Sequence, residues 1–452
     1  MALKNREYDT CHASGTVIFA GLILITKVAL FCLLKNNEVS MSSSGNGIQK
    51  QNYLLSSLWF LFFFICWGSC FPYLSLWLTE RIGINSAEVG MVYTCIATVA
   101  VVFQPIFGIL ADKLHFRKHL MWMLVILMIA FAPWWIWVFA PLLKVSAIAG
   151  AVAGGIFIGL AFGCGCGVCE AYIDKVSRLD GFEFGRARMW GGIGAAVGTF
   201  LSGKLFVVNP DYIFIMASAA GVCLALILLV FRPGKNFLDN VSSERAKVNK
   251  SDIFDLLCTK RFWFLVLYMV GVGAVYETYD QQFAVYYSTF FESKARGAEV
   301  FGYLYTAQIF LDAMTMFFAP AIVNRIGPKN ALLYCGFIMT FRIMGSAMAT
   351  GPVLISTMKL LHGFESSILI IATLKYISAN FDWKLSATVY LIGFQFAKQF
   401  SQIFMSTTIG GMYDVLGFKE SYTILGLVAL VFTVISVFTL SRKRVQPLIP
   451  AH

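Results

Sequence analysis

The chain has 452 residues, of which 58% are hydrophobic and only 13% are charged, whereas soluble domains carry about 25% charged residues. This composition excludes a soluble domain and predicts an all-α polytopic membrane protein, surrounded by a lipid bilayer. The formal net charge of +11 would suit a nucleic-acid-binding protein, but the basic residues lie in short loops between apolar segments. Membrane proteins show this pattern on their cytoplasmic side, so we expect no nucleic-acid partner.

The first 40 residues form a segment of their own. Residues 15–34 are apolar apart from Lys27, and no small-residue cleavage site follows them. Met41 then opens a polar stretch before the next apolar run. We expect the functional protein to start at Met41, with residues 1–40 a start-site artefact or a dispensable anchor; a thirteenth span is the alternative.

Twelve apolar runs follow, and a run of about 20 residues is long enough to cross a bilayer as a helix. They cover residues 53–78, 88–111, 119–142, 147–174, 186–207, 211–231, 262–291, 300–322, 330–349, 353–378, 386–410 and 421–441. The polar stretch 232–260 separates six runs from six and predicts a flexible cytoplasmic linker. We therefore expect an N-terminal six-helix bundle (41–231), a C-terminal one (261–445) and a short tail (446–452).

Lys and Arg gather in the loops after the even-numbered runs, which places both ends of the twelve-helix bundle in the cytoplasm. The halves also repeat. The stretch from Gly108 to Lys118 follows the second run, and the stretch from Asn324 to Lys329 follows the eighth, at the matching place in the second half. Such a parallel repeat predicts a substrate site between the halves, near the middle of the membrane.

The eleven cysteines lie mostly in apolar runs and are expected to be reduced, buried side chains. Cys164, Cys166, Cys169 and Glu170 also suggest a metal site, because thiolates bind soft metals. Only Cys166 and Cys169 share a helix face, however, so buried thiols are the favoured interpretation and no metal or cofactor is expected. An intramembrane metal enzyme is kept as an alternative.

Glu170 and Arg188 lie at similar distances on either side of a short turn near Asp180. An antiparallel hairpin would place both at one depth, roughly 12 Å into the membrane at 1.5 Å per residue. Arg and a carboxylate can pair with each other or share a ligand with hydroxyl groups. We favour a functional pair over an ion pair that only holds the hairpin together.

Four charged residues in other runs are expected to form two neutralised pairs. Glu277 and Asp280 are three residues apart on the seventh run and share a helix face. Lys359 on the tenth run and Lys398 on the eleventh offer the opposite charge. A buried pair is less unfavourable than an unpaired charge, so we favour a structural role for these four residues.

A second set of ionisable residues predicts a proton-coupling centre: Asp312, Arg342, His362 and Glu365. Lys359, His362 and Glu365 recur every three residues, so one side of a helix carries all three and must face protein or water. A carboxyl group in an apolar pocket can hold a proton at neutral pH, and a neighbouring Arg can help to expel it. His can relay a proton or bind a polar ligand.

Short motifs extend over about residues 52–441. They are Phe71-Pro72 with Leu76-Trp77-Leu78; Gln104-Pro105 leading to Gly108, Asp112 and Lys113; Glu170-Ala171-Tyr172 with Lys175 and Arg178; Phe182 to Arg188; Asp280-Gln281-Gln282-Phe283; Asn324 to Gly327 with Lys329; Lys359 with His362 and Glu365; and Leu385 to Thr388. On these motifs the chain resembles the lactose permease group, the oligosaccharide–proton symporters of the major facilitator superfamily.

The resemblance implies a monomeric transporter of the major facilitator fold in a bacterial inner membrane, with a sugar and a proton as its partners. It implies a role for each of the residues of the motifs. Glu170 and Arg188 match the sugar-binding pair, His362 the link between the sugar and proton sites, Glu365 the proton carrier and Arg342 its deprotonating partner; Glu277–Lys398 and Asp280–Lys359 match the interhelical charge pairs, and Gly108, Asp112, Lys113 and Arg117 match the conformational-switch loop.

Departures from the group concern the substrate. Galactoside transporters of this group carry a Trp at the position of Ala195, which stacks on the sugar, and a Glu at the position of Ile309. The sucrose branch also lacks this Glu. It has a Gln one residue before that position and an acidic residue three residues after it, and this chain has Gln308 and Asp312 at the same two places. Cys166 and Gly192 replace two further residues that face the sugar. Asp312, one helical turn along, is expected to reach the sugar or Glu365.

These observations favour proton-coupled symport of sucrose or a related non-galactoside disaccharide, in which His362 and Asp312 bind the sugar together with Glu170 and Arg188. A galactoside symporter and an uncoupled sugar facilitator are the alternatives. A sugar sensor is a further possibility, but the chain offers only a short hydrophilic segment as an output domain. No enzymatic activity is expected.

Overall fold

The computed structural model describes residues 46–114, 118–231, 250–381 and 385–442, and within them every regular element is a helix. Residues 1–40, Arg117 and most of the predicted linker lie outside the described residues. The main helices are α2 (Asn46–Cys70), α4 (Ser86–Leu114), α5 (His119–Ile129), α8 (Ala147–Ile158), α9 (Gly165–Asp180), α10 (Phe184–Val208), α11 (Tyr212–Val230), α12 (Lys250–Cys258), α13 (Lys260–Tyr268), α14 (Ala274–Gln281), α15 (Phe283–Ser288), α16 (Lys294–Ile326), α17 (Pro328–Ala347), α18 (Pro352–Leu360), α19 (His362–Asn380), α21 (Ala397–Leu416) and α22 (Phe418–Thr439). Short helices complete some spans: α3 (Leu74–Trp77), α6 (Phe131–Trp134), α7 (Ala140–Val145) and α20 (Ser386–Val389).

Each of the twelve predicted spans coincides with one helix or with a run of consecutive helices. Within the described part of the chain, nine helices are long and apolar enough to cross a membrane, and the pair 119–129 and 131–145, bent by 54°, makes a tenth. The other two predicted spans are α17 and the run from α20 to α21, which are helical but more polar and carry Arg342 and Lys398.

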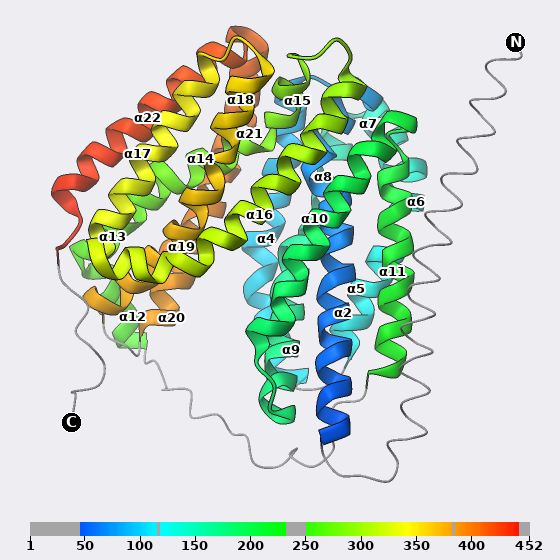
Figure 1. Cartoon of the computed structure of the whole chain (residues 1–452), viewed down its shortest axis with the longest axis horizontal. Helices are drawn as coiled ribbons and strands as arrows, with labels where there is room; N and C mark the ends of the chain where they lie inside the picture. The colour runs from blue at the N-terminus through cyan, green and yellow to red at the C-terminus, as the bar shows by residue number, and fades with distance from the viewer. Residues whose placement is uncertain (1–45, 115–117, 232–249, 382–384, 443–452) are drawn as a thin grey trace, which may run out of the picture. The chain divides into compact units, whose positions relative to one another are not determined.

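Helix contacts divide the chain into two compact units, and the first consists of the residues up to Leu74 together with 102–146 and 160–241. In this unit α2 packs against α10 and α11, and α11 packs against α5 (Figure 1). The approach of α2 to α10 is close because small residues face each other. A Cβ atom on Gly68 would lie 2.5 Å from the carbonyl oxygen of Ala195, so only glycine fits at position 68.

The second unit comprises residues 75–101, 147–159 and 242 onwards. Here α16 packs on α19, and α17 packs on both α19 and α22 (Figure 1). The first part of α4 belongs to this unit because Gly90 lies directly on the backbone of α21 at Ser406. These units cross the boundary between the two six-helix bundles, which therefore stay a prediction of the sequence.

Several spans contain a π-helical turn, in which hydrogen bonds reach one residue further than in an α-helix. Three of these turns directly precede helices that carry ionisable residues: 159–164 before α9, 269–273 before α14 and 390–396 before α21. Each is rich in glycine or aromatic residues. The turns shift the following helix around its axis, so helical spacing alone does not predict which way Glu170, Glu277 and Lys398 point.

The prediction of a flexible linker over 232–260 is wrong for its last part, because residues 250–258 form the helix α12. Its apolar residues Phe254, Leu256 and Leu257 stand among polar ones, and Leu256 is buried. Burial of even one such side chain favours a helix in a segment that is polar overall.

Candidate functional site

Glu170 and Arg188 meet across the hairpin between α9 and α10. The chain reverses at Gly181, whose positive φ of 71° suits glycine after a helix end. Nε of Arg188 lies 2.7 Å from Oε1 of Glu170, and the two side chains are 33% and 38% exposed. The guanidinium of Arg188 therefore binds Glu170 through Nε, and it also lies beside the thiol of Cys166.

Cysteines surround this pair without forming a metal site. Sγ of Cys166 lies 3.6 Å from Oε1 of Glu170, and Sγ of Cys169 accepts a hydrogen bond of 3.2 Å from the indole of Trp59. No group of three His, Cys, Asp or Glu side chains in the described ranges could hold a metal ion. The nine cysteines described are all free thiols.

The ion pair of Arg342 and Glu365 is fully buried between α17 and α19. Nη2 of Arg342 lies 2.6 Å from Oε1 of Glu365, and the side chains are 0% and 1% exposed. Nδ1 of His362 lies 3.3 Å from the same carboxylate oxygen. The other oxygen, Oε2, is buried and has no hydrogen-bond partner among the described residues. A buried polar oxygen without a hydrogen-bond partner is energetically unfavourable.

Asp280 on α14 connects this ion pair to Lys359. Its Oδ1 lies 2.7 Å from Nζ of Lys359 and 3.4 Å from Nη1 of Arg342, and its Oδ2 lies 4.0 Å from Nε2 of His362. The sequence suggested two separate sets, a pair of Asp280 with Lys359 and a coupling centre around Glu365. The structure joins them into one network through Arg342.

This network has a balanced charge. With His362 neutral, the two carboxylates of Asp280 and Glu365 offset Arg342 and Lys359. Arg342 thus has two carboxylate partners, Glu365 and Asp280. Because an unpaired buried charge is strongly destabilising, the second partner helps to stabilise the guanidinium in the protein interior.

Glu277 and Lys398 form the other predicted pair. Nζ of Lys398 lies 2.5 Å from Oε1 of Glu277, and the amide of Gln402 donates to Oε2 of the same residue. Both carboxylate oxygens are thus satisfied by α21, so this pair joins α14 to α21.

Asp312 on α16 does not contact Glu365. Its Oδ1 accepts hydrogen bonds of 2.5 Å from the hydroxyl groups of Ser366 and Ser367, which follow Glu365 directly on α19. Asp312 is half-buried. Ile309 lies one turn before it and is half-buried as well.

The residues of the predicted switch loop are only partly described. Gly108 lies within α4, and Asp112 and Lys113 belong to its last turn. Arg117 is outside the described residues. Their role in the conformational change stays a prediction.

Sequence reasoning missed several neighbours of the charged residues. Ser366, Ser367 and Gln402 went unnoticed because hydroxyl and amide side chains are common in membrane helices. The signal for them is spacing: the serines adjoin Glu365, and Gln402 lies one helical turn after Lys398. Tyr276, whose ring lies 5.3 Å from that of His362, was noted without a role.

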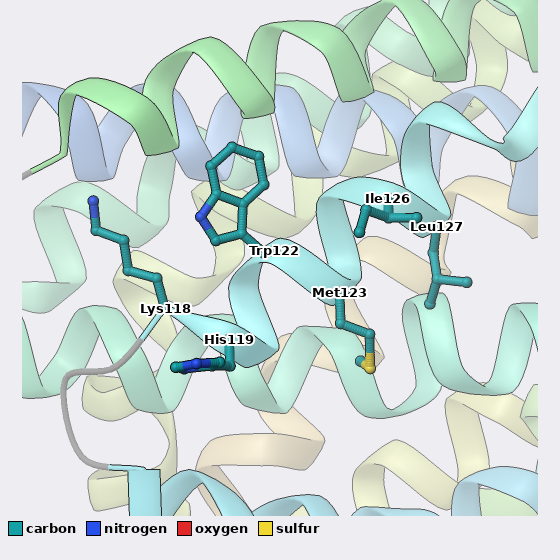
Figure 2. Close-up of a pocket in the computed structure, with 6 residues that line it drawn as sticks. All are labelled: Lys118, His119, Trp122, Met123, Ile126 and Leu127. Atoms are coloured by element: carbon teal, nitrogen blue, oxygen red, sulfur yellow. The ribbon is translucent and has the colours of Figure 1, made fainter.

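A groove of about 550 Å³ lies away from these residues, along α5. Figure 2 shows its lining: Lys118, His119, Trp122, Met123, Ile126 and Leu127. The ammonium group of Lys118 is bound to the carbonyl groups of Leu228 and Phe231 at the end of α11. The groove has no carboxylate for sugar hydroxyl groups, so it does not suit a sugar.

The helical fold and its buried charge networks define a polytopic membrane transporter. The family model described as LacY proton/sugar symporter matches residues 46–452, so this chain belongs to that family. It is a sugar–proton symporter of the major facilitator fold and not an enzyme. The resemblance deduced from the sequence motifs is thereby confirmed.

Curated relatives span nearly the whole chain. A melibiose permease of Enterobacter cloacae is 43% identical over 87% of this chain and 93% of that permease. A raffinose permease of Escherichia coli is 42% identical over 89% of this chain and 95% of its own length. A sucrose permease of Escherichia coli is 34% identical, covering 87% and 95%.

Among solved structures, the nucleoside transporter NupG superposes with a TM-score of 0.73 at 15% identity, covering 85% of this chain and 98% of that one. At this identity the likeness shows the fold alone.

Proposed function

We propose that this protein imports a galactoside together with a proton across a bacterial inner membrane. The observation that carries the proposal is the buried network in which Glu365 meets Arg342 and His362 while one of its oxygens stays without a partner. The melibiose and raffinose permeases, at 43% and 42% identity, favour a sugar that ends in a galactosyl group.

The proposed sugar-binding pair is Glu170 with Arg188. Arg188 binds Glu170 through Nε, and its terminal nitrogens can donate to sugar hydroxyl groups. Glu170 can accept from further hydroxyl groups with its second oxygen, and such charge-assisted hydrogen bonds are strong. His362 and Asp312 are proposed to bind sugar hydroxyl groups as well, because an imidazole and a carboxylate can both form hydrogen bonds with them.

The proposed proton carrier is Glu365. Sugar binds while Glu365 is protonated, and release of the proton is assisted by Arg342, which gains a charged partner when Glu365 ionises. While Glu365 is protonated, Asp280 remains as the charged partner of Arg342. Glu277–Lys398 and Asp280–Lys359 hold helices together, and Gly108, Asp112, Lys113 and Arg117 belong to the moving loop. The protein works as a monomer, and the positively charged loops face the cytoplasm.

Sucrose is the second candidate substrate, supported by Ile309 and by Asp312 one turn later on α16. The relative that transports sucrose by name is 34% identical, which is less than the other two. A panel of melibiose, raffinose, lactose and sucrose therefore decides the substrate.

Sugar addition to weakly buffered cells that express the protein tests the whole proposal. Melibiose or raffinose should raise the external pH as the labelled sugar enters. Glu365→Gln should keep sugar exchange and lose accumulation against a gradient, whereas the exposed Glu420→Gln should behave as wild type. Uptake without a pH change would make the protein an uncoupled facilitator, and uptake of sucrose alone would refute the galactoside.

A further inference from the structure

One face of α2 is less covered than the rest of the helix. Leu61, Phe64 and Trp67, together with Phe71 in the short turn (Phe71–Tyr73) that continues α2, are half-buried, whereas the residues between them are mostly buried. Their spacing of three or four residues places them on a single stripe of the helix. Three of the four are aromatic. Trp67 lies parallel to Phe71, with ring centroids 5.5 Å apart and an interplanar angle of 18°.

This aromatic stripe adjoins the proposed sugar-binding pair. The guanidinium carbon of Arg188 lies 4.2 Å from the centre of the Phe64 ring. The Phe64 ring in turn lies 6.4 Å from that of Trp67. Because a guanidinium and a carboxylate avoid hydrocarbon, the side of α2 that carries Phe64 faces the polar interior rather than lipid.

Trp67 lies level with Ala195 on the neighbouring helix. Its neighbour Gly68 touches the backbone of Ala195, so close that a Cβ atom would lie 2.5 Å from that carbonyl oxygen. Ala195 comes seven residues after Arg188 on α10, which is two helical turns or roughly 10 Å. A disaccharide with one ring at Arg188 would therefore extend to the level of Trp67.

The galactoside transporters that this chain resembles carry an aromatic platform at the position of Ala195, where this chain has a methyl group. We propose that Trp67 of α2 supplies that platform instead, and so determines which sugars bind. The proposal rests on the proposed galactoside transport and adds to it the residue that the ring stacks on.

The chemistry suits this role. A galactosyl ring carries its axial 4-hydroxyl on one face, which leaves C–H groups together on the other. Those weakly positive hydrogens are attracted to the negative face of an indole. In the described parts of the chain, the indole N–H of Trp67 has no acceptor, so it can donate to a sugar hydroxyl. Phe71, stacked on Trp67, holds the ring in position.

Binding of melibiose to purified protein tests the role of Trp67 through three variants. Trp67→Phe keeps an aromatic face and should bind within about threefold of wild type. Trp67→Leu keeps apolar bulk without that face and should bind roughly tenfold more weakly. Trp137→Leu removes a tryptophan that is 75% exposed and should bind as wild type. The thermal midpoint of each variant shows that it is folded.

Transport measurements distinguish the proposed role of Trp67 from the proposed transport of galactosides. For Trp67→Leu, half-maximal transport should need about tenfold more melibiose, while the number of protons taken up per sugar molecule stays unchanged. If folded Trp67→Leu binds melibiose as tightly as Trp67→Phe does, the platform is refuted although galactoside transport stands. If wild type neither binds nor imports any galactoside of the panel, the proposed function itself has failed.

Discussion

Oδ1 of Asp312 accepts a hydrogen bond of 2.5 Å from the hydroxyl of Ser366, the residue that follows Glu365. This contact ties α16 to α19 one residue away from the proposed proton carrier. The carboxylate of Asp312 is therefore held by two serines of α19 and does not contact Glu365 directly.

Loss of both serine hydroxyl groups should loosen this contact. We expect the double variant Ser366→Ala/Ser367→Ala to lower the free energy of unfolding by about 2 kcal/mol, because Asp312 loses two charge-assisted hydrogen bonds and is only partly compensated by water. Thermal unfolding in detergent measures the effect. Ser378→Ala, an exposed site on the same helix, is the control; equal midpoints for control and double variant would show that the serines do not hold Asp312.

Sugar accumulation should require the guanidinium group of Arg342, and not only its positive charge. It contacts Glu365 and Asp280 at once, which the single ammonium group of a lysine cannot reproduce. We expect Arg342→Lys to keep the protein folded but to lose sugar accumulation at least tenfold while exchange continues. The ratio of internal to external sugar measures this. Arg296→Lys, at an exposed position, should accumulate sugar normally, and normal accumulation by Arg342→Lys would contradict the two-carboxylate role.

Glu277 and Lys398 should depend on each other. Removal of either partner leaves a buried charge unpaired, which destabilises by about 3–5 kcal/mol, whereas removal of both leaves none. We therefore expect Glu277→Ala and Lys398→Ala each to reduce the amount of folded protein in the membrane, and the double variant to restore it. Immunoblots of membranes from equal numbers of cells give the amounts. If the membranes contain as little of the double variant as of the less abundant single variant, the two residues do not form a structural pair.

Asp414 should stabilise the start of α4. Its two carboxylate oxygens accept hydrogen bonds of 2.9 Å and 2.8 Å from the backbone N–H groups of Ser86 and Ala87. These donors have no partner within the helix, so a carboxylate there acts as a cap from a distant helix. We expect Asp414→Ala to lower the free energy of unfolding by about 1 kcal/mol and Asp414→Asn by less.

The measurement is again thermal unfolding of purified protein, with Glu420→Gln as the exposed control. Because the cap joins α4 to α21, Asp414→Ala should also raise amide hydrogen exchange at the first turn of α4. Unchanged exchange there would mean that the contact contributes nothing in solution.

Much of the fold was predictable from the sequence for a simple reason. An apolar run of membrane length must be helical, since its backbone has no other hydrogen-bond partners in lipid. All twelve predicted spans are helical for this reason. The pair Glu170–Arg188 was also anticipated, because a charge deep in a membrane needs a partner and few partners exist. That Glu277 pairs with Lys398 was implied by the family resemblance.

Other features depended on information that the sequence hides. The π-helical turns before α9, α14 and α21 rotate the charged residues that follow, and no spacing rule predicts them. The helix over 250–258 was missed because Lys250, Ser251, Asp252 and Asp255 made the segment look polar. The preference for sucrose came from two positions on one helix, whereas over nearly the whole chain the melibiose permease is 43% identical and the sucrose permease 34%.

By itself, the sequence determined that this protein spans a membrane as helices, and which charged residues need partners, because burying an unpaired charge or peptide group is unfavourable in any fold. Only the tertiary structure decided how those residues are joined. Arg342 connects Glu365 to Asp280, two serines hold Asp312, and an aromatic stripe on α2 lies level with Ala195. These contacts link helices far apart in the chain, and their geometry depends on packing between helices that no single segment encodes.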